Sequence, residues 1–344
     1  MKKTGIALML IACIMLSGCK DNSSPEQMGE EQIKRKLQIG MSFDSFVIER
    51  WQRDRDIFVS TAKELGAEVN VQNANGIVEE QIAQIEYFIE KQMDVIVIIC
   101  IESEGLQDVV EKAQKAGIKV IAYDRMIKSS NVDLYISFDN EMVGALMAQT
   151  LVDAGLPNKK VLMVCGSAAD NNVPEVERGF LKVMEVNGVE VLGKYYADGW
   201  KSELAYQYIY DNPELLEQVD GIMCGNDNLA TSVVRALSEK RLAGVIKVVG
   251  QDADLEACQR IVEGTQVMTV YKPVEKLAQN AAEYAIKLAK GNSLPDIPKV
   301  EDGVNLVPGI VLDPIPVTIK NIDKEIINSG YHLREDVYLN VPQK

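Results

Sequence analysis

The sequence contains a single histidine and none of the common catalytic motifs. His332 lies near the C-terminus in GYHLRED, where we expect it at the surface. The patterns GxSxG, HExxH and GxxxxGK[ST] are missing, and with them the signatures of α/β-hydrolases, zinc peptidases and P-loop nucleotidases. We therefore expect a protein that is not an enzyme and needs no cofactor.

Paired cysteines are also missing. None of the six cysteines forms a CxxC pair, which argues against a zinc site, and we expect no metal. Cys100, Cys165 and Cys224 each end a strand-like apolar run, which predicts buried, hydrophobic thiols. A disulfide between Cys165 and Cys224 on neighbouring strands is the alternative.

Positive charge is scarce as well. The chain has 36 lysines and arginines against 51 aspartates and glutamates, a formal net charge of −15. Nucleic acid needs a basic protein face, and an acidic lipid surface needs a polybasic patch. The charge therefore argues against nucleic acid as a partner and suits a soluble protein outside the cell.

The apolar run behind Lys2 and Lys3 is about 14 residues long, too short to span a bilayer but typical of a secretory signal. It ends in Leu-Ser-Gly-Cys, which resembles a bacterial lipobox, so Cys19 is expected to be lipidated and to become the mature N-terminus. The alternative is an ordinary signal peptide with an incidental cysteine. We expect a signal peptide at 1–18, a polar tether at 19–36, and an extracytoplasmic protein held to the membrane by its lipid.

Short apolar runs and helical patterns alternate from residue 37 onward, and the rhythm restarts at residue 159. Strands are expected at 37–43, 67–74, 94–100, 119–124, 159–166, 188–196, 220–227, 246–252 and 266–272. Helices are expected at 49–65, 79–91, 106–116, 175–187, 202–210, 229–240 and 254–263. This alternation predicts an α/β fold with doubly wound parallel sheets, and the restart predicts two similar lobes.

Each half ends one expected strand with an aspartate, Asp124 in the first and Asp252 in the second. Ligands of open α/β sheets bind beyond the carboxyl ends of the strands. If the lobes face each other, both carboxylates point into a shared cleft. Other polar residues fall at equivalent places: Arg50, Asp170, Asn172 and Asn226.

These side chains suit a neutral, polyhydroxylated ligand. Carboxylates accept and arginines donate paired hydrogen bonds with vicinal hydroxyls, and a ring such as that of Trp200 covers the apolar face of a sugar. Structural alternatives exist: Asp170 and Asp252 precede helices as N-caps do, and Trp51 lies on an apolar helix face that favours the core. Two carboxylates across a cleft also occur in glycosidases, but pairing with arginine and asparagine keeps both ionised.

Several stretches in order resemble the sugar-binding proteins of bacterial ABC importers, the type I periplasmic-binding-protein family, and its D-xylose-binding members most of all. They are IERWQRDRDIF (48–58), QNANG (72–76), AYDRMI (122–127), YISFDNE (135–141), ADNN (169–172), DGW (198–200), GQDADL (250–255) and TVYKP (269–273). The resemblance covers about residues 37–335. It implies two doubly wound parallel-sheet lobes joined by a three-strand hinge, with a sugar in the cleft.

The resemblance also implies where the lobes begin and end. The N-terminal lobe would comprise 37–140 plus 275–303, and the C-terminal lobe 141–272 plus 306–344. The three crossings between the lobes, which would act as hinges, are expected near 138–141, 271–273 and 304–308.

The sugar contacts of the family carry over by resemblance onto Arg50, Asp124, Arg125, Asp170, Asn172, Trp200, Asn226, Asp252 and Lys272. Trp200 would stack on the pyranose face, and Arg125 would donate to the sugar or brace neighbouring acids. The stretches SFDSFVIERW and VPEVERG depart from the family pattern. They lie near the expected cleft rim, where they bear on the partner surface and on fine specificity.

The function implied by this resemblance is a lipid-anchored receptor that binds D-xylose, closes around it and delivers it to an ABC permease. The alternative is a sensor that docks on a membrane histidine kinase or chemoreceptor, for which the altered rim and the tether are the motivation. A lac-repressor-type regulator shares the fold but needs an N-terminal helix-turn-helix where this chain has a signal sequence. We expect a monomer.

Overall fold

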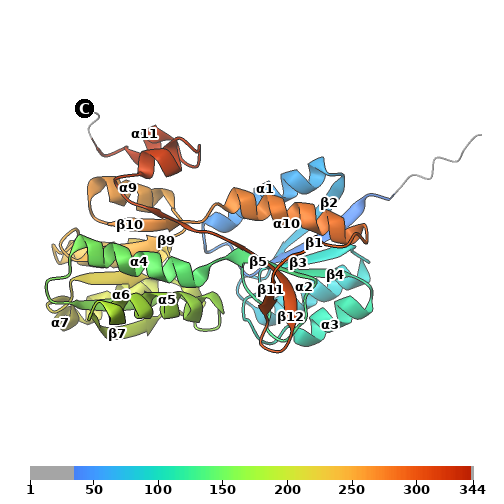
Figure 1. The fold of residues 1–344 in the computed structure, drawn as a ribbon, viewed down its shortest axis with the longest axis horizontal. Coiled ribbons are helices and arrows are strands. Elements are labelled where there is room, and N and C mark those ends of the chain that lie inside the picture. Colours follow the sequence, from blue (N-terminus) through green and yellow to red (C-terminus); the bar gives the residue numbers. More distant parts are fainter. Residues whose placement is uncertain (1–34, 342–344) are drawn as a thin grey trace, which may run out of the picture. The chain divides into compact units, whose positions relative to one another are not determined.

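Two twisted sheets, each covered by helices on both faces, make up the structure, a computed structural model that describes residues 35–341 (Figure 1). The expected signal peptide, the lipidation site Cys19 and nearly all of the tether lie outside the described residues. No helix among the described residues has both the length and the apolar character needed to cross a membrane.

The first sheet has the strand order β11-β12-β5-β4-β3-β1-β2. All its pairings are parallel except that of β11 with β12. The strands are β1 (Leu37–Phe43), β2 (Ala67–Asn73), β3 (Val95–Ile98), β4 (Lys119–Tyr123), β5 (Leu134–Phe138), β11 (Lys299–Glu301) and β12 (Leu306–Leu312). Helices α1 (Arg50–Glu64) and α10 (Val274–Ala289) pack together on one face, and α2 (Val78–Glu90) and α3 (Gln107–Lys115) on the other.

The second sheet has the order β13-β10-β9-β8-β6-β7, so its parallel core repeats the order of β5-β4-β3-β1-β2. Its strands are β6 (Lys160–Cys165), β7 (Glu190–Tyr196), β8 (Gly221–Cys224), β9 (Lys247–Gln251), β10 (Met268–Tyr271) and the antiparallel β13 (Ile315–Val317). Helices α4 (Asn140–Ala154) and α5 (Asn172–Val186) pack together, as do α6 (Ser202–Asp211) and α8 (Asp227–Glu239). The predicted fold of two doubly wound lobes is confirmed.

The remaining elements are short and belong to the second lobe. They are the 3₁₀ turn η1 (Asp198–Trp200), α7 (Pro213–Leu216), α9 (Leu255–Glu263), the π-helical turn η2 (Asp323–Ile327) and α11 (Arg334–Val337). The segment that carries η2 and α11 packs on α9, at the end of the second lobe (Figure 1).

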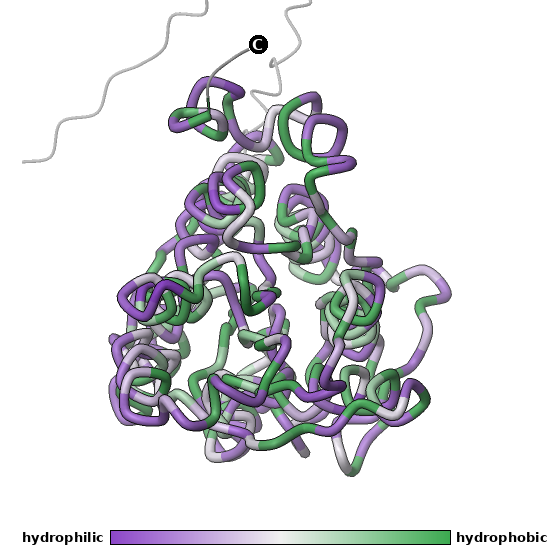
Figure 2. The backbone as a smooth tube through the Cα atoms, turned by 90° about the vertical axis from the view of Figure 1, so that its left-hand side faces the viewer, coloured by the Kyte–Doolittle hydropathy of each residue, from purple (hydrophilic) through white to green (hydrophobic). Residues whose placement is uncertain are grey.

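The elements follow from ordinary sequence rules. Every residue of β3 is buried, as a parallel strand covered on both faces requires. Helix α4 is capped by Asp139, whose side chain accepts a hydrogen bond from the Met142 amide at 2.8 Å. Along most helices hydrophobic and hydrophilic residues follow one another every few positions (Figure 2). Such amphipathic helices pack their apolar face on a sheet and turn their polar face to solvent.

The chain passes between the sheets after β5, after β10 and after β12, at residues 139, 272–273 and 313–314. The third crossing was predicted wrongly, at 304–308. There the Asp302 carboxylate accepts hydrogen bonds from the amides of Val304 and Asn305, which turns the chain back into the β11–β12 hairpin. Residues 306–308 then pair with β11 and 309–312 with β5, so β12 belongs to the first sheet and not to the C-terminal lobe as expected.

The cysteines of the described residues are free, buried thiols, so the alternative of a disulfide between Cys165 and Cys224 is not found. Burial raises the pKa of both thiols. A thiol reagent added to residues 20–344 is expected to label none of the four thiols, Cys100, Cys165, Cys224 and Cys258, in the folded protein and all of them after denaturation without reductant. Only two labelled thiols after denaturation would contradict the structure.

Candidate functional site

A buried pocket lies between the two sheets, at the carboxyl ends of their strands. Its volume is about 20 Å³, which is small for a ligand pocket. All the predicted site residues except Asn226 line it, together with three others. The lining residues are Ile48, Arg50, Trp51, Asp124, Arg125, Asp170, Asn172, Trp200, Gln251, Asp252 and Lys272.

Arg50, the first residue of α1, is at the centre of the charged groups and is 3% exposed. Its Nε and Nη2 donate to Asp54, one turn along the helix, at 3.1 and 2.9 Å. Asp54 also accepts a hydrogen bond from Tyr123, the last residue of β4. The fork of Arg50 is thereby fixed, and its Nη1 lies 3.0 Å from Asp124 Oδ2 and 3.9 Å from Asp252 Oδ1.

Asp124 follows β4 and joins the two lobes. Its Oδ1 accepts a hydrogen bond of 2.9 Å from the side-chain amide of Asn172, the first residue of α5 in the second lobe. Burial alone would raise the pKa of Asp124, but Arg50, Lys272 and Arg125 hold it below its usual value. Asp124 is therefore an ionised acceptor at neutral pH, as the sequence predicted.

Arg125 does not pair with its neighbour Asp124 but braces two other carboxylates. It is 2% exposed, donates to Asp44 at 2.7 Å, and its Nε lies 2.6 Å from Asp170 Oδ2 in the second lobe. It also donates to the carbonyl of Cys100 at 2.9 Å. Of the two roles expected for Arg125, bracing is the one that these contacts supply.

Trp200 reaches the pocket because two glycines make room for its ring. A Cβ at Gly166, directly after β6, would lie 2.2 Å from the ring, and one at Gly225, directly after β8, would lie 3.2 Å from it. Trp200 itself has φ of +59°, a left-handed conformation set by the tight turn η1. Trp51 packs on Phe43 in the core, as predicted, and it also lines the pocket.

Asp252, for which a helix cap was the alternative, is not a cap, whereas Asn226 is one. Asp252 is not the cap of α9, because that position is held by Asp254; its Oδ1 lies 3.2 Å from Lys272 Nζ instead. Asn226 does cap α8, and its Oδ1 accepts from the Leu229 amide at 2.9 Å. Asn226 is buried next to the pocket but does not line it.

Several buried polar atoms at this site have no hydrogen-bond partner among residues 35–341. They are Arg50 Nη1, Trp51 Nε1, Asp124 Oδ2, Arg125 Nη2, Asn172 Oδ1, Trp200 Nε1, Asn226 Nδ2, Gln251 Oε1 and Asp252 Oδ1. Some are ion-paired, but without the alignment of a hydrogen bond. Buried polar groups in folded proteins are nearly always satisfied, so both donors and acceptors here are available to a polar ligand.

The residues missed by sequence analysis are mostly those that hold others in place. Gln251 lines the pocket directly before Asp252, and its Nε2 donates to the Gly225 carbonyl. Asn171 accepts a hydrogen bond of 2.7 Å from the Met126 amide across the lobes. Asp54 could have been found, because it stands four residues after Arg50 on an expected helix; Asp44 and Tyr123 carry no such signal.

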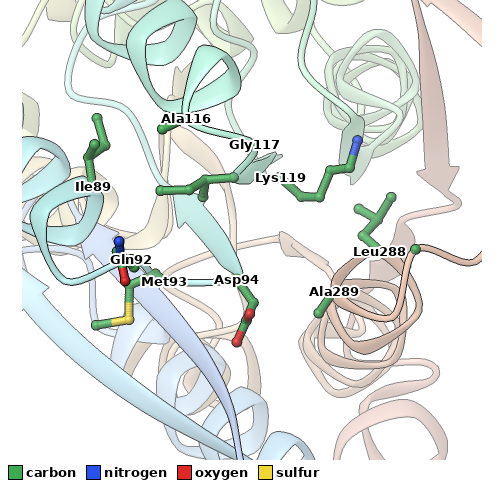
Figure 3. Close-up of a pocket in the computed structure, with 11 residues that line it drawn as sticks. Ile89, Gln92, Met93, Asp94, Ala116, Gly117, Lys119, Leu288 and Ala289 are labelled. Carbon is green, nitrogen blue, oxygen red and sulfur yellow. The ribbon is translucent and has the colours of Figure 1, made fainter. Parts of the chain in front are cut away.

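A larger, open hollow lies at the opposite, amino-terminal edge of the first sheet (Figure 3). Its two charged side chains are already engaged: Asp94 accepts from the Gln38 amide at 2.7 Å, and Lys119 donates to Asp133 at 2.7 Å. The rest of the lining includes Ile89, Met93 and Leu288. Because no set of available polar atoms converges there, the pocket between the sheets is the candidate site.

Comparison with known proteins agrees with this geometry. Residues 39–293 match the periplasmic binding protein domain. Relatives named D-xylose-binding periplasmic proteins are 43% identical in Haemophilus influenzae and 41% identical in Escherichia coli; each match covers 88% of this chain and 93% of the relative. A solute-binding protein of an ABC transporter from Clostridium phytofermentans, solved with bound β-D-glucose, has a TM-score of 0.79 at 27% identity and covers 87% of this chain and 99% of that one. The chain belongs to the periplasmic binding protein family.

Proposed function

We propose that this protein binds a monosaccharide, D-xylose, in the pocket between its lobes and delivers it to an ABC importer. The observation that carries the proposal is the set of buried donors and acceptors without hydrogen-bond partners, contributed by both lobes around the pocket between the sheets. Relatives of 41 and 43% identity named for D-xylose support the choice of sugar.

The proposed contacts follow from the atoms that are available. Asp124, Asn172, Gln251 and Asp252 would accept hydrogen bonds from sugar hydroxyls through the oxygens that lack partners. The donors would be Arg50, Arg125, Asn226 and Lys272. Trp200 would stack on the apolar face of the pyranose ring, and Asp170 would act through Arg125.

Closure of the lobes would be the mechanism. The two lobes make direct contacts beside the pocket, between Asn172 and Asp124, Arg125 and Asp170, and the Ser103 amide and the Ala169 carbonyl at 3.1 Å. A ligand held by residues of both lobes binds the closed state better than the open one and shifts the population towards it. Hinge closure around a ligand is a general property of periplasmic binding proteins, and the permease would recognise the closed form.

The location proposed for the protein comes from the sequence. Cleavage before Cys19 and its lipidation would anchor the protein outside the cytoplasm, with residues up to 36 as a tether. We propose a binding protein and not an enzyme. The alternative of a sensor that docks on a kinase or chemoreceptor is not proposed, because no contact or surface of residues 35–341 favours it.

The test is a calorimetric titration of residues 20–344 with xylose, ribose, arabinose, glucose and galactose. We expect one-to-one binding, with xylose preferred over glucose by at least about ten-fold, because the hydroxymethyl group of a hexose needs room that a small pocket lacks. Tighter binding of glucose or ribose would overturn the choice of sugar. No binding of any of the five would overturn the proposed function.

A further inference from the structure

The turn that carries Asp252 has a strained backbone. Asp252 and Ala253 have φ of +99° and +56°, the left-handed region that residues other than glycine rarely adopt. Part of the turn is held by its own lobe: the Asp252 amide donates to the Val270 carbonyl at 2.8 Å and the Ala253 amide to Thr269 Oγ1 at 3.1 Å. Of the two carbonyls of the turn, that of Ala253 accepts a weak hydrogen bond from the Cys258 thiol at 3.7 Å, and both have further partners.

Those partners come from the C-terminal segment, about 80 residues further along the chain. Tyr331 donates its hydroxyl to the Asp252 carbonyl at 3.3 Å, and His332 Nε2 lies 2.8 Å from the Ala253 carbonyl, which makes Nε2 the protonated nitrogen. His332 is therefore half-buried and hydrogen-bonded, contrary to the surface position predicted from the sequence. The ring of Tyr331 packs on Tyr271, next to the second crossing, with centroids 4.7 Å apart.

Tyr331 also contacts the first lobe, through Arg53. Arg53, one turn after Arg50 on α1, lays its guanidinium 4.0 Å from the centre of the Tyr331 ring and donates to the Tyr331 carbonyl at 2.9 Å. Its Nη1 lies 3.4 Å from Glu275 on α10, a helix that also packs on the first sheet. Arg53 and Arg50 therefore both reach from α1 to the second lobe. Arg53 contacts Tyr331, and Arg50 approaches Asp252.

We infer that Arg53, Tyr331 and His332 form a latch that holds the lobes closed and positions the Asp252 carboxylate, although none of the three lines the pocket. The inference rests on the proposed function, since the latch acts on the affinity for the sugar. Opening of the lobes would separate Arg53 from Tyr331. Tyr331 would then hold the turn of Asp252 less firmly. The latch is therefore expected to slow the release of sugar more than it speeds its entry.

The test compares Arg53→Ala and Tyr331→Phe with Arg55→Ala as the matched control. Arg55 lies on the same helix, but it pairs with the neighbouring Asp56 at 2.7 Å and lies 5.3 Å from the centre of the Phe46 ring, both in the first lobe. Tyr331→Phe keeps the ring under Arg53 and removes only the hydroxyl that reaches Asp252. Calorimetry gives the affinity for xylose, stopped-flow tryptophan fluorescence the dissociation rate, and thermal unfolding without sugar the stability.

We expect Arg53→Ala to weaken binding about ten-fold and Tyr331→Phe about five-fold, mostly through faster dissociation, with Arg55→Ala unchanged. The double variant is expected to lose less than the product of the two effects, because Arg53 acts through Tyr331. Unchanged affinity and dissociation rate in both single variants would overturn the latch, even if the melting temperature fell. If Arg53→Ala does not fold, Tyr331→Phe decides alone. Failure of the wild type to bind any of the five sugars would instead overturn the proposed function.

Discussion

Replacement of Asp124 by asparagine is expected to weaken xylose binding by at least about 100-fold. Asp124 Oδ1 accepts a hydrogen bond from the Asn172 amide, and Oδ2 faces Arg50 Nη1 at 3.0 Å. Both neighbours are donors, so the new NH₂ group meets a donor whichever way the asparagine is turned. Loss of one partner from a buried, hydrogen-bonded charge pair costs about 2–5 kcal/mol, and each 1.4 kcal/mol is ten-fold in affinity.

The matched control for Asp124→Asn is Asp133→Asn. Asp133 also pairs with a cation, Lys119 at 2.7 Å, and accepts from a backbone amide, that of Val120 at 2.9 Å, but it lies at the other edge of the same sheet. Calorimetry on both variants, with thermal unfolding to show that each is folded, separates loss of the site from loss of stability. Affinity within about five-fold of the wild type in a folded Asp124→Asn protein would exclude Asp124 as a sugar ligand.

Replacement of Gly166 by alanine is expected to weaken binding by about 100-fold, although the change adds only one methyl group. The new Cβ would lie 2.2 Å from the end of the Trp200 ring, closer than two carbon atoms can approach. The ring cannot move away without disturbing the site, because it lines the pocket and its backbone is set by a tight turn. An overpacked site costs about 1–3 kcal/mol, and a displaced ring loses its stacking on the sugar as well.

The control for Gly166→Ala is Gly193→Ala on the neighbouring strand β7. A Cβ there would meet the hydroxyl of Tyr208 at 3.2 Å and the side chain of Leu162 at 3.6 Å, neither of which lines the pocket. Tryptophan fluorescence during a xylose titration reports the environment of Trp51 and Trp200, the only tryptophans in the chain. Unchanged affinity and an unchanged fluorescence response in Gly166→Ala would show that the position of the Trp200 ring does not matter for binding.

The site residues that sequence analysis found share a simple physical origin. Asp124 and Asp252 each follow a buried parallel strand, and the carboxyl ends of such strands meet at one edge of a sheet. The alternation of strands and helices therefore places them in a common cleft without knowledge of any contact. Arg50 follows from the same logic, because it begins the helix after β1.

The residues that sequence analysis missed depend on packing between distant segments. Asp44 braces Arg125 across 81 residues, and Tyr331 reaches the Asp252 carbonyl across 79 residues. Gly166 looks like an ordinary residue at a strand end until the ring of Trp200 is placed on it. The third crossing was missed because Asp302 closes a hairpin through side-chain hydrogen bonds that composition does not reveal.

A crystal structure of residues 20–344 grown with xylose tests the central claim most directly. The proposed function predicts one sugar in the pocket between the lobes, with hydroxyls within hydrogen-bond distance of Asp124, Asn172 and Asp252. It also predicts the sugar ring stacked on Trp200, and the Arg125–Asp170 ion pair still closed across the lobes. A pocket without sugar at saturating xylose, or a sugar bound only elsewhere on the protein, would contradict it.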